Sequence, residues 1–504
     1  MNSSLTFLDL IVAAIYLLLS VAIGMWMGRN NRNIDDYLLG GRNMSWWAIL
    51  GSIVSTETSA ATFLSVPGLA YAQGGNFSFL QLAFGYILGR IVVTMFLLPL
   101  YFRGELLTAY QILQTRFGIS TRRIASGTFL VTRNLGDGLR MFLTGLTLHH
   151  VTGWSMTVCI LIAGGVTILY TLYGGLRSVV WSDCIQFVIY MIAAAVTLWI
   201  LIDRIPGNWA GLMEFGRENQ KFVLFDWSWD WSKPFTFWAG IVGGMFITLG
   251  SHGTDQMMVQ RCLAAPNCRD AGKAMIASGL IVFFQFAVFL LIGTALAAFF
   301  HSHPPAAALS KDESYLAFIM QELPSGLRGL TLAGIFAAAF TGSLNACAST
   351  LIGDFGSLFR VDRLSESQRV TLSRAATFVF GIVQMIVALI AAALASDSSL
   401  VENVLAVAGL SAGVLLGVFI LGQLPLRVTE PGAIAGMATA LIVVFGVCIE
   451  TKMPHLIGFE KSPFPIAYPW WPVIGSALTV FVGIAASYVS QRATTAAAAE
   501  ESVA

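Results

Sequence analysis

The chain has 504 residues, of which 56% are hydrophobic and only 11% charged, and its formal net charge is +1. Soluble domains carry about 25% charged residues, so this composition excludes an ordinary soluble domain and predicts an integral membrane protein. The balanced charge gives no indication of a nucleic-acid partner, and the lack of a GxxxxGK[ST] loop argues against transport driven by ATP. The six cysteines lack CxxC spacing, so neither a disulfide framework nor a zinc site is expected.

Thirteen apolar stretches are each long enough to cross a bilayer, which takes roughly 20 helical residues. We place these spans near residues 7–28, 45–72, 79–101, 124–150, 154–174, 183–203, 236–259, 272–300, 328–352, 372–396, 402–425, 431–450 and 469–491. An odd number of spans puts the termini on opposite sides of the membrane. The loops after the odd-numbered spans, with the tail, hold most of the Lys and Arg residues, which predicts an outer N-terminus and a cytoplasmic C-terminus.

The second span is interrupted at its centre by the sequence STETS at residues 55–59. Because every backbone amide in hydrocarbon needs a partner, such a polar break is tolerated only beside protein or a water-filled cavity. Carriers use discontinuous helices of this kind to bind ions and polar solutes. The alternative is an intact helix in which Glu57 pairs with a neighbouring helix. The break predicts a binding site within the membrane.

The seventh span, 236–259, is rich in glycine and is the second span that we expect to be discontinuous. Five spans run from the second to the sixth and five more from the seventh to the eleventh, as two inverted five-helix repeats require. We therefore divide the chain into a first helix with its inner loop, a first repeat, an outer loop, a second repeat, two further helices and a tail. These segments are residues 1–44, 45–203, 204–235, 236–425, 426–491 and 492–504. The tryptophan-rich outer loop predicts either a lid or an interfacial aromatic belt.

The end of the seventh span reads GTDQ at residues 253–256 and VQR at 259–261. This string resembles the signature of the sodium:solute symporter family, which includes sodium/galactose, sodium/proline and sodium/sialic acid symporters and the iodide and monocarboxylate carriers. Four further stretches agree with it, namely RFG at 116–118, YGGL at 173–176, WSDCIQ at 181–186 and AGIFAAA at 333–339. The resemblance covers the second to eleventh spans and implies an all-α, LeuT-like fold with a five-plus-five inverted-repeat core. For Asp255 and Arg261 we expect structural roles, as a helix cap and an inner-side anchor.

The resemblance also implies a sodium ion between the second and ninth spans. Two backbone carbonyls of the family's site match Gly51 and Val54. The opposite half, an Ala-x-x-Ser-[Ser/Thr] pattern, matches Ala338 and Thr341, but Gly342 stands where the family has a second hydroxyl. Sodium needs several hard oxygen ligands, as other hard cations do, so this departure predicts a weaker or displaced site. Ser343 and Asn345 are the nearest substitutes.

Asp183, at the start of the sixth span, matches an acidic position that lines a second sodium site in the sialic acid type. An unpaired carboxylate in this place would be costly. We therefore expect Asp183 to bind a cation, a proton or an arginine.

The solute site lies, by resemblance, beside the break in the second span. The residues that we assign to it are Ser55, Glu57, Thr58, Phe77, Gln81 and Arg140. On the fourth span, Arg133, Asp137 and Arg140 are spaced i, i+4 and i, i+3 and share one helix face. Asp137 alone can neutralise only one arginine, which leaves a positive charge for a substrate carboxylate. The alternative is a structural Arg-Asp-Arg cluster, and Arg90 is interpreted as a snorkelling or structural charge.

The sequence thus predicts a sodium-coupled secondary symporter that works by alternating access in the cell membrane. Its solute would be a small organic anion, such as sialic acid or a monocarboxylate. The alternatives are a neutral sugar or amino acid symporter, coupled to sodium or protons, and a non-transporting sensor on the same fold. No enzyme motif of the HExxH type appears. Sodium is the only cofactor expected, the bilayer and the solute are the partners, and the oligomeric state stays open.

Overall fold

The computed structural model describes residues 5–29, 33–58, 60–104, 106–305, 309–311, 313–337, 343–394, 400–452, 454 and 458–501. These residues form helices and short turns, with no strand among them. The helices are α1 (Phe7–Gly28), α2 (Ile34–Leu39), α3 (Trp46–Glu57), α4 (Ala60–Tyr71), α5 (Leu80–Val92), α6 (Leu98–Tyr101), α7 (Gln111–Arg116), α8 (Ile119–Thr152), α9 (Met156–Arg204), α10 (Asn208–Glu218), α11 (Gly244–Gly253), α12 (Gln256–Leu263), α13 (Cys268–Ser302), α14 (Ser314–Glu322), α15 (Leu327–Ala337), α16 (Ser343–Phe355), α17 (Glu366–Leu394), α18 (Leu400–Gln423), α19 (Glu430–Lys452) and α20 (Trp471–Glu501). The prediction of an all-helical protein is confirmed.

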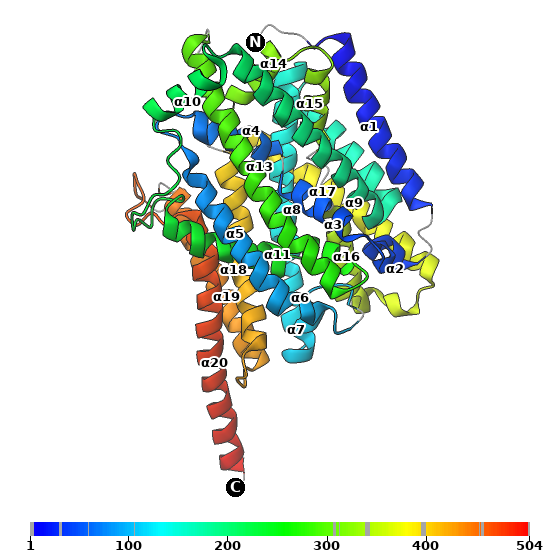
Figure 1. Ribbon diagram of the computed structural model, residues 1–504. Helices are drawn as coiled ribbons and strands as arrows, with labels where there is room; N and C mark the ends of the chain where they lie inside the picture. Colours follow the sequence, from blue (N-terminus) through cyan, green and yellow to red (C-terminus); the bar gives the residue numbers. More distant parts are fainter. Residues whose placement is uncertain are drawn as a thin grey trace.

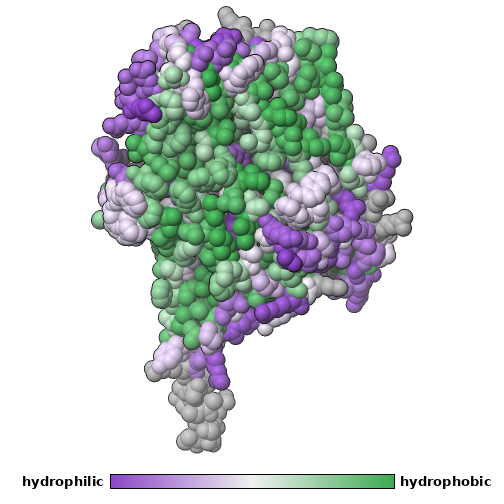
Figure 2. Space-filling model, viewed as in Figure 1, coloured by the Kyte–Doolittle hydropathy of each residue, from purple (hydrophilic) through white to green (hydrophobic). Residues whose placement is uncertain are grey.

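Six helical segments in the described part of the chain are long and apolar enough to cross a membrane. They are Phe77–Tyr101, Gly174–Arg204, Cys268–Ser302, Glu366–Ala393, Glu430–Lys452 and Tyr468–Gln491. The bent pair α3 and α4 adds a seventh candidate. Figure 2 shows a broad apolar surface over the middle of the molecule, with hydrophilic side chains gathered toward its ends. A multi-pass membrane protein is therefore confirmed, whereas the number of thirteen spans stays a prediction.

The second span is discontinuous, as its polar run predicts. The axes of α3 and α4 differ by 58°, and Thr58 leaves the helical region with φ −85° and ψ 70°. The helix nevertheless continues through Ser55 to Glu57, so the break falls at the end of the polar run. Ser59 lies outside the described residues.

The seventh span is also discontinuous, and its break falls at the last of its glycines. Helix α11 runs to Gly253, and α12 starts at Gln256 after the extended residue Asp255. The upstream glycines let this span approach α5 closely, because a Cβ at Gly240 would lie 2.7 Å from the Gln81 carbonyl oxygen and one at Gly244 would lie 2.6 Å from the Leu82 carbonyl oxygen. Of the glycines expected at the break, Gly253 lies at it, whereas Gly240 and Gly243 belong to a π-helical turn through which the helix continues.

The helices surround a core in which α13 packs against α3, α4 and α5 (Figure 1). Helices α18, α19 and α20 pack together, and the last of them runs away from the rest of the molecule toward the C-terminus (Figure 1). The N- and C-termini lie at opposite ends of the molecule in this view. This arrangement brings the breaks of the second and seventh spans beside α8, where the charged residues of the fourth span lie.

Candidate functional site

A cavity of about 380 Å³ lies between the two discontinuous spans. Helices α3, α4, α5, α8, α11, α12, α13 and α18 contribute to its wall, together with residues 232–235, 451–452 and 467–468. Ligand sites in proteins typically fall between about 300 and 1,000 Å³ and combine apolar walls with a few polar groups. The volume is thus adequate for a small solute.

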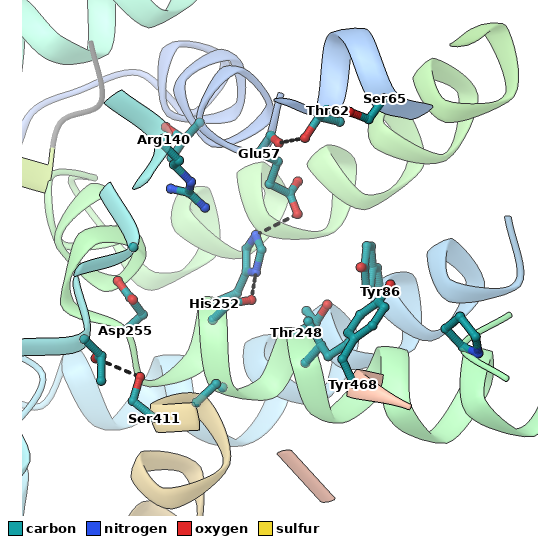
Figure 3. A pocket seen from close by; sticks show the side chains of 18 of the residues that line it. Glu57, Thr62, Ser65, Tyr86, Arg140, Thr248, His252, Asp255, Ser411 and Tyr468 are labelled. Atoms are coloured by element: carbon teal, nitrogen blue, oxygen red, sulfur yellow. Dashed lines mark hydrogen bonds and ion pairs between the residues drawn. The ribbon is translucent and has the colours of Figure 1, made fainter. Parts of the chain in front are cut away.

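Glu57 brings a carboxylate to the cavity wall at the end of α3. Its side chain is 14% exposed and forms an ion pair with the completely buried Arg90 of α5. One carboxylate oxygen also lies 3.3 Å from Nε2 of His252 on α11 (Figure 3). The Arg90 guanidinium is 3.2 Å from the same ring nitrogen, and Nδ1 of His252 is 2.9 Å from the Ser251 hydroxyl. Glu57 therefore both lines the cavity and pairs with neighbouring helices.

A second charged group, the α8 charge cluster, consists of Arg133, Asp137, Arg140 and Asp255. Asp137 accepts from Arg133 at 2.8 Å and from Arg140 at 3.1 Å, which confirms that the three residues of α8 share one face. Asp255 caps α12 by accepting from the Met257 amide at 2.8 Å, as predicted, and also pairs with Arg133 at 3.3 Å. The two carboxylates balance the two arginines, so the prediction of a net positive cluster was wrong. Asp255, which lies 122 residues from Arg133 along the chain, supplies the second carboxylate.

Arg140 is the member of the α8 charge cluster with spare hydrogen-bonding capacity. Its side chain is 21% exposed and points into the same open space as His252 and Asp255 (Figure 3). Its Nη1 donates to Asp137, and its Nε is buried without a partner among the described residues, so Nη1 and Nη2 are the nitrogens that a solute could reach. A guanidinium held at one corner in this way can still donate to an anion.

Asp183 is paired with an arginine, one of the three partners that its burial predicts. Arg261 lies 3.1 Å from the carboxylate through Nη2 and donates through Nε to the Ser52 hydroxyl at 2.8 Å. Ser52 in turn donates to Asp183 at 2.5 Å. Arg261 is completely buried, so its interpretation as an inner-side anchor was wrong: the guanidinium lies in the interior because Asp183 neutralises it there.

Four of the six predicted solute residues lie outside the wall that the described residues form. The Ser55 hydroxyl donates to Gln186 at 3.2 Å, and the Thr58 hydroxyl donates to the Val54 carbonyl at 2.9 Å. Gln81 is fully buried and uses its amide group on backbone atoms of Ser78, Phe235 and Asp226. Phe77 packs edge-on against Phe222. Their contact with solute stays a prediction, and it requires a rearrangement of these hydrogen bonds.

Only one half of the predicted sodium site, the half on α3, lies within the described residues. Gly51 lies inside α3, where a Cβ would come 2.8 Å from Sγ of Cys184, and the Val54 carbonyl accepts from the Thr58 amide at 3.1 Å. Ala338, Thr341 and Gly342 lie outside the described residues. Of the substitutes, Asn345 accepts from Gln260 at 2.7 Å and Ser343 accepts from Gln384 at 3.3 Å. No cluster of three or more His, Cys, Asp or Glu residues suited to a metal occurs in the described ranges.

Sequence reasoning missed several residues of the cavity wall. His252 and Ser251 directly precede the GTDQ string, and Tyr86 lies one turn before Arg90 on α5. Lys452 and Tyr468 belong to the last two helical segments, outside the ten spans of the expected core. The position of His252 beside a family motif was an available signal, whereas nothing in the local sequence places Tyr468 at the cavity.

The chain matches the sodium:solute symporter family over residues 37–440. It belongs to this family. Its sequence is 29% identical over 475 residues to the sodium-coupled monocarboxylate transporter 2 of Bos taurus, covering 91% of this chain and 75% of that protein. It is 26% identical over 485 residues to a sodium/sialic acid symporter of Aliivibrio fischeri, covering 94% and 92%.

The fold of this family member is also similar to a solved structure of a Na⁺-coupled sialic acid symporter, in a substrate-bound outward-open state with a novel Na⁺ site. The TM-score is 0.83 at 25% sequence identity, over 96% of this chain and 98% of the other. The motifs quoted above therefore identified the family correctly, and the similarity extends along nearly the whole chain.

Proposed function

We propose that this chain is a sodium-coupled symporter that takes up a small organic anion by alternating access. The relatives named above carry monocarboxylates and sialic acid, both of which are organic anions. The observation on which the proposal mainly depends is Arg140, whose guanidinium lines the cavity, points into it and belongs to a side chain that is 21% exposed (Figure 3). Arginine recognises carboxylates through paired N–H donors, so this side chain suits one end of such a solute.

The sodium ion in this proposal binds at the break of the second span. The carbonyls of Gly51 and Val54 supply one half of its site, and Thr341 with the carbonyl of Ala338 supplies the other. Sodium bound there holds α3 and α4 in the shape that favours solute, so each ligand raises the affinity of the protein for the other. Asp183 is a second candidate ligand only if Arg261 moves away from it.

A neutral solute is the second candidate, and one observation favours it. Asp255 balances the α8 charge cluster, so Arg133 and Arg140 together bring no net charge to the cavity once both carboxylates are counted. A neutral sugar or a zwitterionic amino acid carries no net charge and gains nothing from a strongly cationic site, so it suits a site whose charges are balanced.

Uptake into proteoliposomes separates these candidates. Purified protein is reconstituted and supplied with radiolabelled pyruvate, N-acetylneuraminate, galactose or proline under an inward sodium or potassium gradient. We expect accumulation of an anion with sodium only, a loss of at least tenfold in Arg140→Ala, and partial retention in Arg140→Lys. Arg204→Ala is the control, because Arg204 is half-exposed and pairs with Glu322 away from the cavity.

Two results would count against the proposal. Sodium-driven uptake of galactose or proline but not of the anions would support the neutral alternative. Anion uptake that is unchanged in Arg140→Ala would remove the carboxylate contact.

A further inference from the structure

Arg90 neutralises a cavity residue without forming part of the cavity wall itself. The residue lies on α5, is completely buried, and reaches Glu57 from behind. On its other side it packs against Gly279 of α13, where a Cβ would lie 3.0 Å from Nη1. Its Nε and Nη1 have no hydrogen-bond partner among the described residues. The ion pair with Glu57 is therefore the main compensation for a buried charge.

The charges in the cavity explain why this pair matters for a solute. Helices α3 and α8 and the α11–α12 break place five charged side chains in the wall, namely Glu57, Asp137, Asp255, Arg133 and Arg140. Three of them are carboxylates and two are guanidiniums, so this part of the wall alone carries one excess negative charge. Lys311 and Lys452 also line the cavity, and the guanidinium of Arg90 adds to this balance by neutralising the carboxylate of Glu57, with which it pairs.

We propose that Arg90 determines the charge selectivity of the cavity, by cancelling the carboxylate of Glu57 and leaving Arg140 as the group that an anion meets. This inference rests on the proposed function, because it concerns which solutes the cavity accepts. Arg90 acts through Glu57 and is therefore a positioning residue, together with His252, which lies within 3.3 Å of the same carboxylate. Tyr86, from α5, lines the cavity on the same side.

Removal of the guanidinium exposes the cavity to the charge of Glu57. We take a separation of about 8 Å between the Glu57 carboxylate and a solute carboxylate held by Arg140 across the cavity. With an effective dielectric constant of about 20, repulsion at that distance weakens anion binding roughly 30-fold. The same unbalanced carboxylate attracts a cationic group, so affinity for an amine-bearing solute rises.

The test compares four purified proteins: wild type, Arg90→Gln, Glu57→Gln and the double variant with both changes. Binding of pyruvate, N-acetylneuraminate, galactose and galactosamine is measured by calorimetry in sodium buffer. We expect Arg90→Gln to bind the preferred anion roughly 30-fold more weakly and galactosamine more tightly than wild type. The double variant carries no charge at either position, so it should bind the anion more tightly than Arg90→Gln does and should not share the gain in affinity for galactosamine.

The double variant also protects the test against misfolding, because it leaves no buried charge unpaired. If Arg90→Gln does not yield folded protein, Arg90→Lys, which keeps the charge, should retain the anion preference, and loss of that preference in Arg90→Lys would overturn the inference. Unchanged selectivity in Arg90→Gln, or a double variant with anion binding as weak as that of Arg90→Gln, would overturn the inference.

The solutes that the wild-type protein binds test the proposed function separately from the inference about Arg90. If wild type binds galactose and neither anion, the proposed function fails. The charge inference then stands or falls on whether Arg90→Gln gains affinity for galactosamine relative to galactose, while the double variant does not.

Discussion

Replacing Asp183 by Asn is expected to destabilise the protein while leaving its response to sodium intact. Asn has nearly the shape of Asp and can still accept hydrogen bonds from Ser52 and Arg261, so the change removes mainly the charge. Arg261, which is completely buried, then keeps its hydrogen bonds to the Ser52 hydroxyl at 2.8 Å, to the Met257 carbonyl at 2.8 Å and to the new amide oxygen, but it has no counter-charge. An uncompensated guanidinium would remain in the interior.

The size of the effect follows from the geometry. Two charges 3.1 Å apart attract by roughly 5 kcal/mol at an effective dielectric constant of about 20. The remaining hydrogen bonds retain part of this, in agreement with the 3–5 kcal/mol typically lost when one partner of a buried pair is removed. Unfolding entropy is about 2.1 cal/mol/K per residue, so over 504 residues the melting midpoint should fall by roughly 3–5 °C.

Thermal unfolding of the purified protein in detergent, with sodium or with potassium, measures both parts of the prediction. The double variant Asp183→Asn/Arg261→Gln should recover most of the lost midpoint, and Ser52→Ala, which removes one hydrogen bond, should cost about 1 kcal/mol. A melting midpoint of Asp183→Asn equal to that of wild type would refute the contribution of the buried ion pair to stability. We also expect sodium to raise the melting midpoint of wild type relative to potassium. If this rise is lost in Asp183→Asn but kept in Ser52→Ala, Asp183 binds the sodium ion, and Arg261 does not take the place of that ion.

Two further predictions concern packing and the outer loop. Gly85→Ala should sharply lower the yield of folded protein, because its Cβ would lie 2.2 Å from the Gly240 carbonyl oxygen. Gly446→Ala is the control, because a Cβ there would have nothing within 4 Å. Equal yields of the two variants by size-exclusion chromatography would contradict the close helix contact. Lys221→Met should speed chymotryptic cleavage at the aromatic residues of the segment 219–237 roughly tenfold, because Lys221 donates to three carbonyls at the end of α4. Cleavage no faster than in Lys233→Met would argue against this tether.

The sequence predicted those features that depend on local chemistry. Composition and apolar length identified a helical membrane protein, and the polar run at residues 55–59 located the first break to within a few residues. The spacing of Arg133, Asp137 and Arg140 placed them on one face, since helical periodicity fixes which side chains are neighbours. These inferences need only the geometry of a single helix.

The features that sequence could not supply are contacts between distant segments. The glycines of the seventh span suggested a break, which falls at Gly253, but only the fold shows that Gly240 and Gly244 permit close packing against α5. Gln81 looked suited to a solute, yet its amide group is used on the backbone of residues 226 and 235. The net charge near Arg140 depended on Asp255, which lies 115 residues away and became a partner only through the fold. Contacts between helices decide whether a polar side chain is free to bind a solute, and the periodicity of a single helix does not predict such contacts.

The two breaks share one electrostatic arrangement. Each discontinuous span carries a carboxylate at its break, Glu57 at the end of α3 and Asp255 at the start of α12. Each carboxylate pairs with an arginine on a continuous neighbouring helix, Arg90 on α5 and Arg133 on α8. Half-helices that change orientation during alternating access must keep such charges paired or expose them to water, because an unpaired charge in the interior is costly. The two ion pairs therefore connect the binding cavity to the segments that would have to move, and a solute that alters the charge balance of the cavity alters the stability of both connections at once.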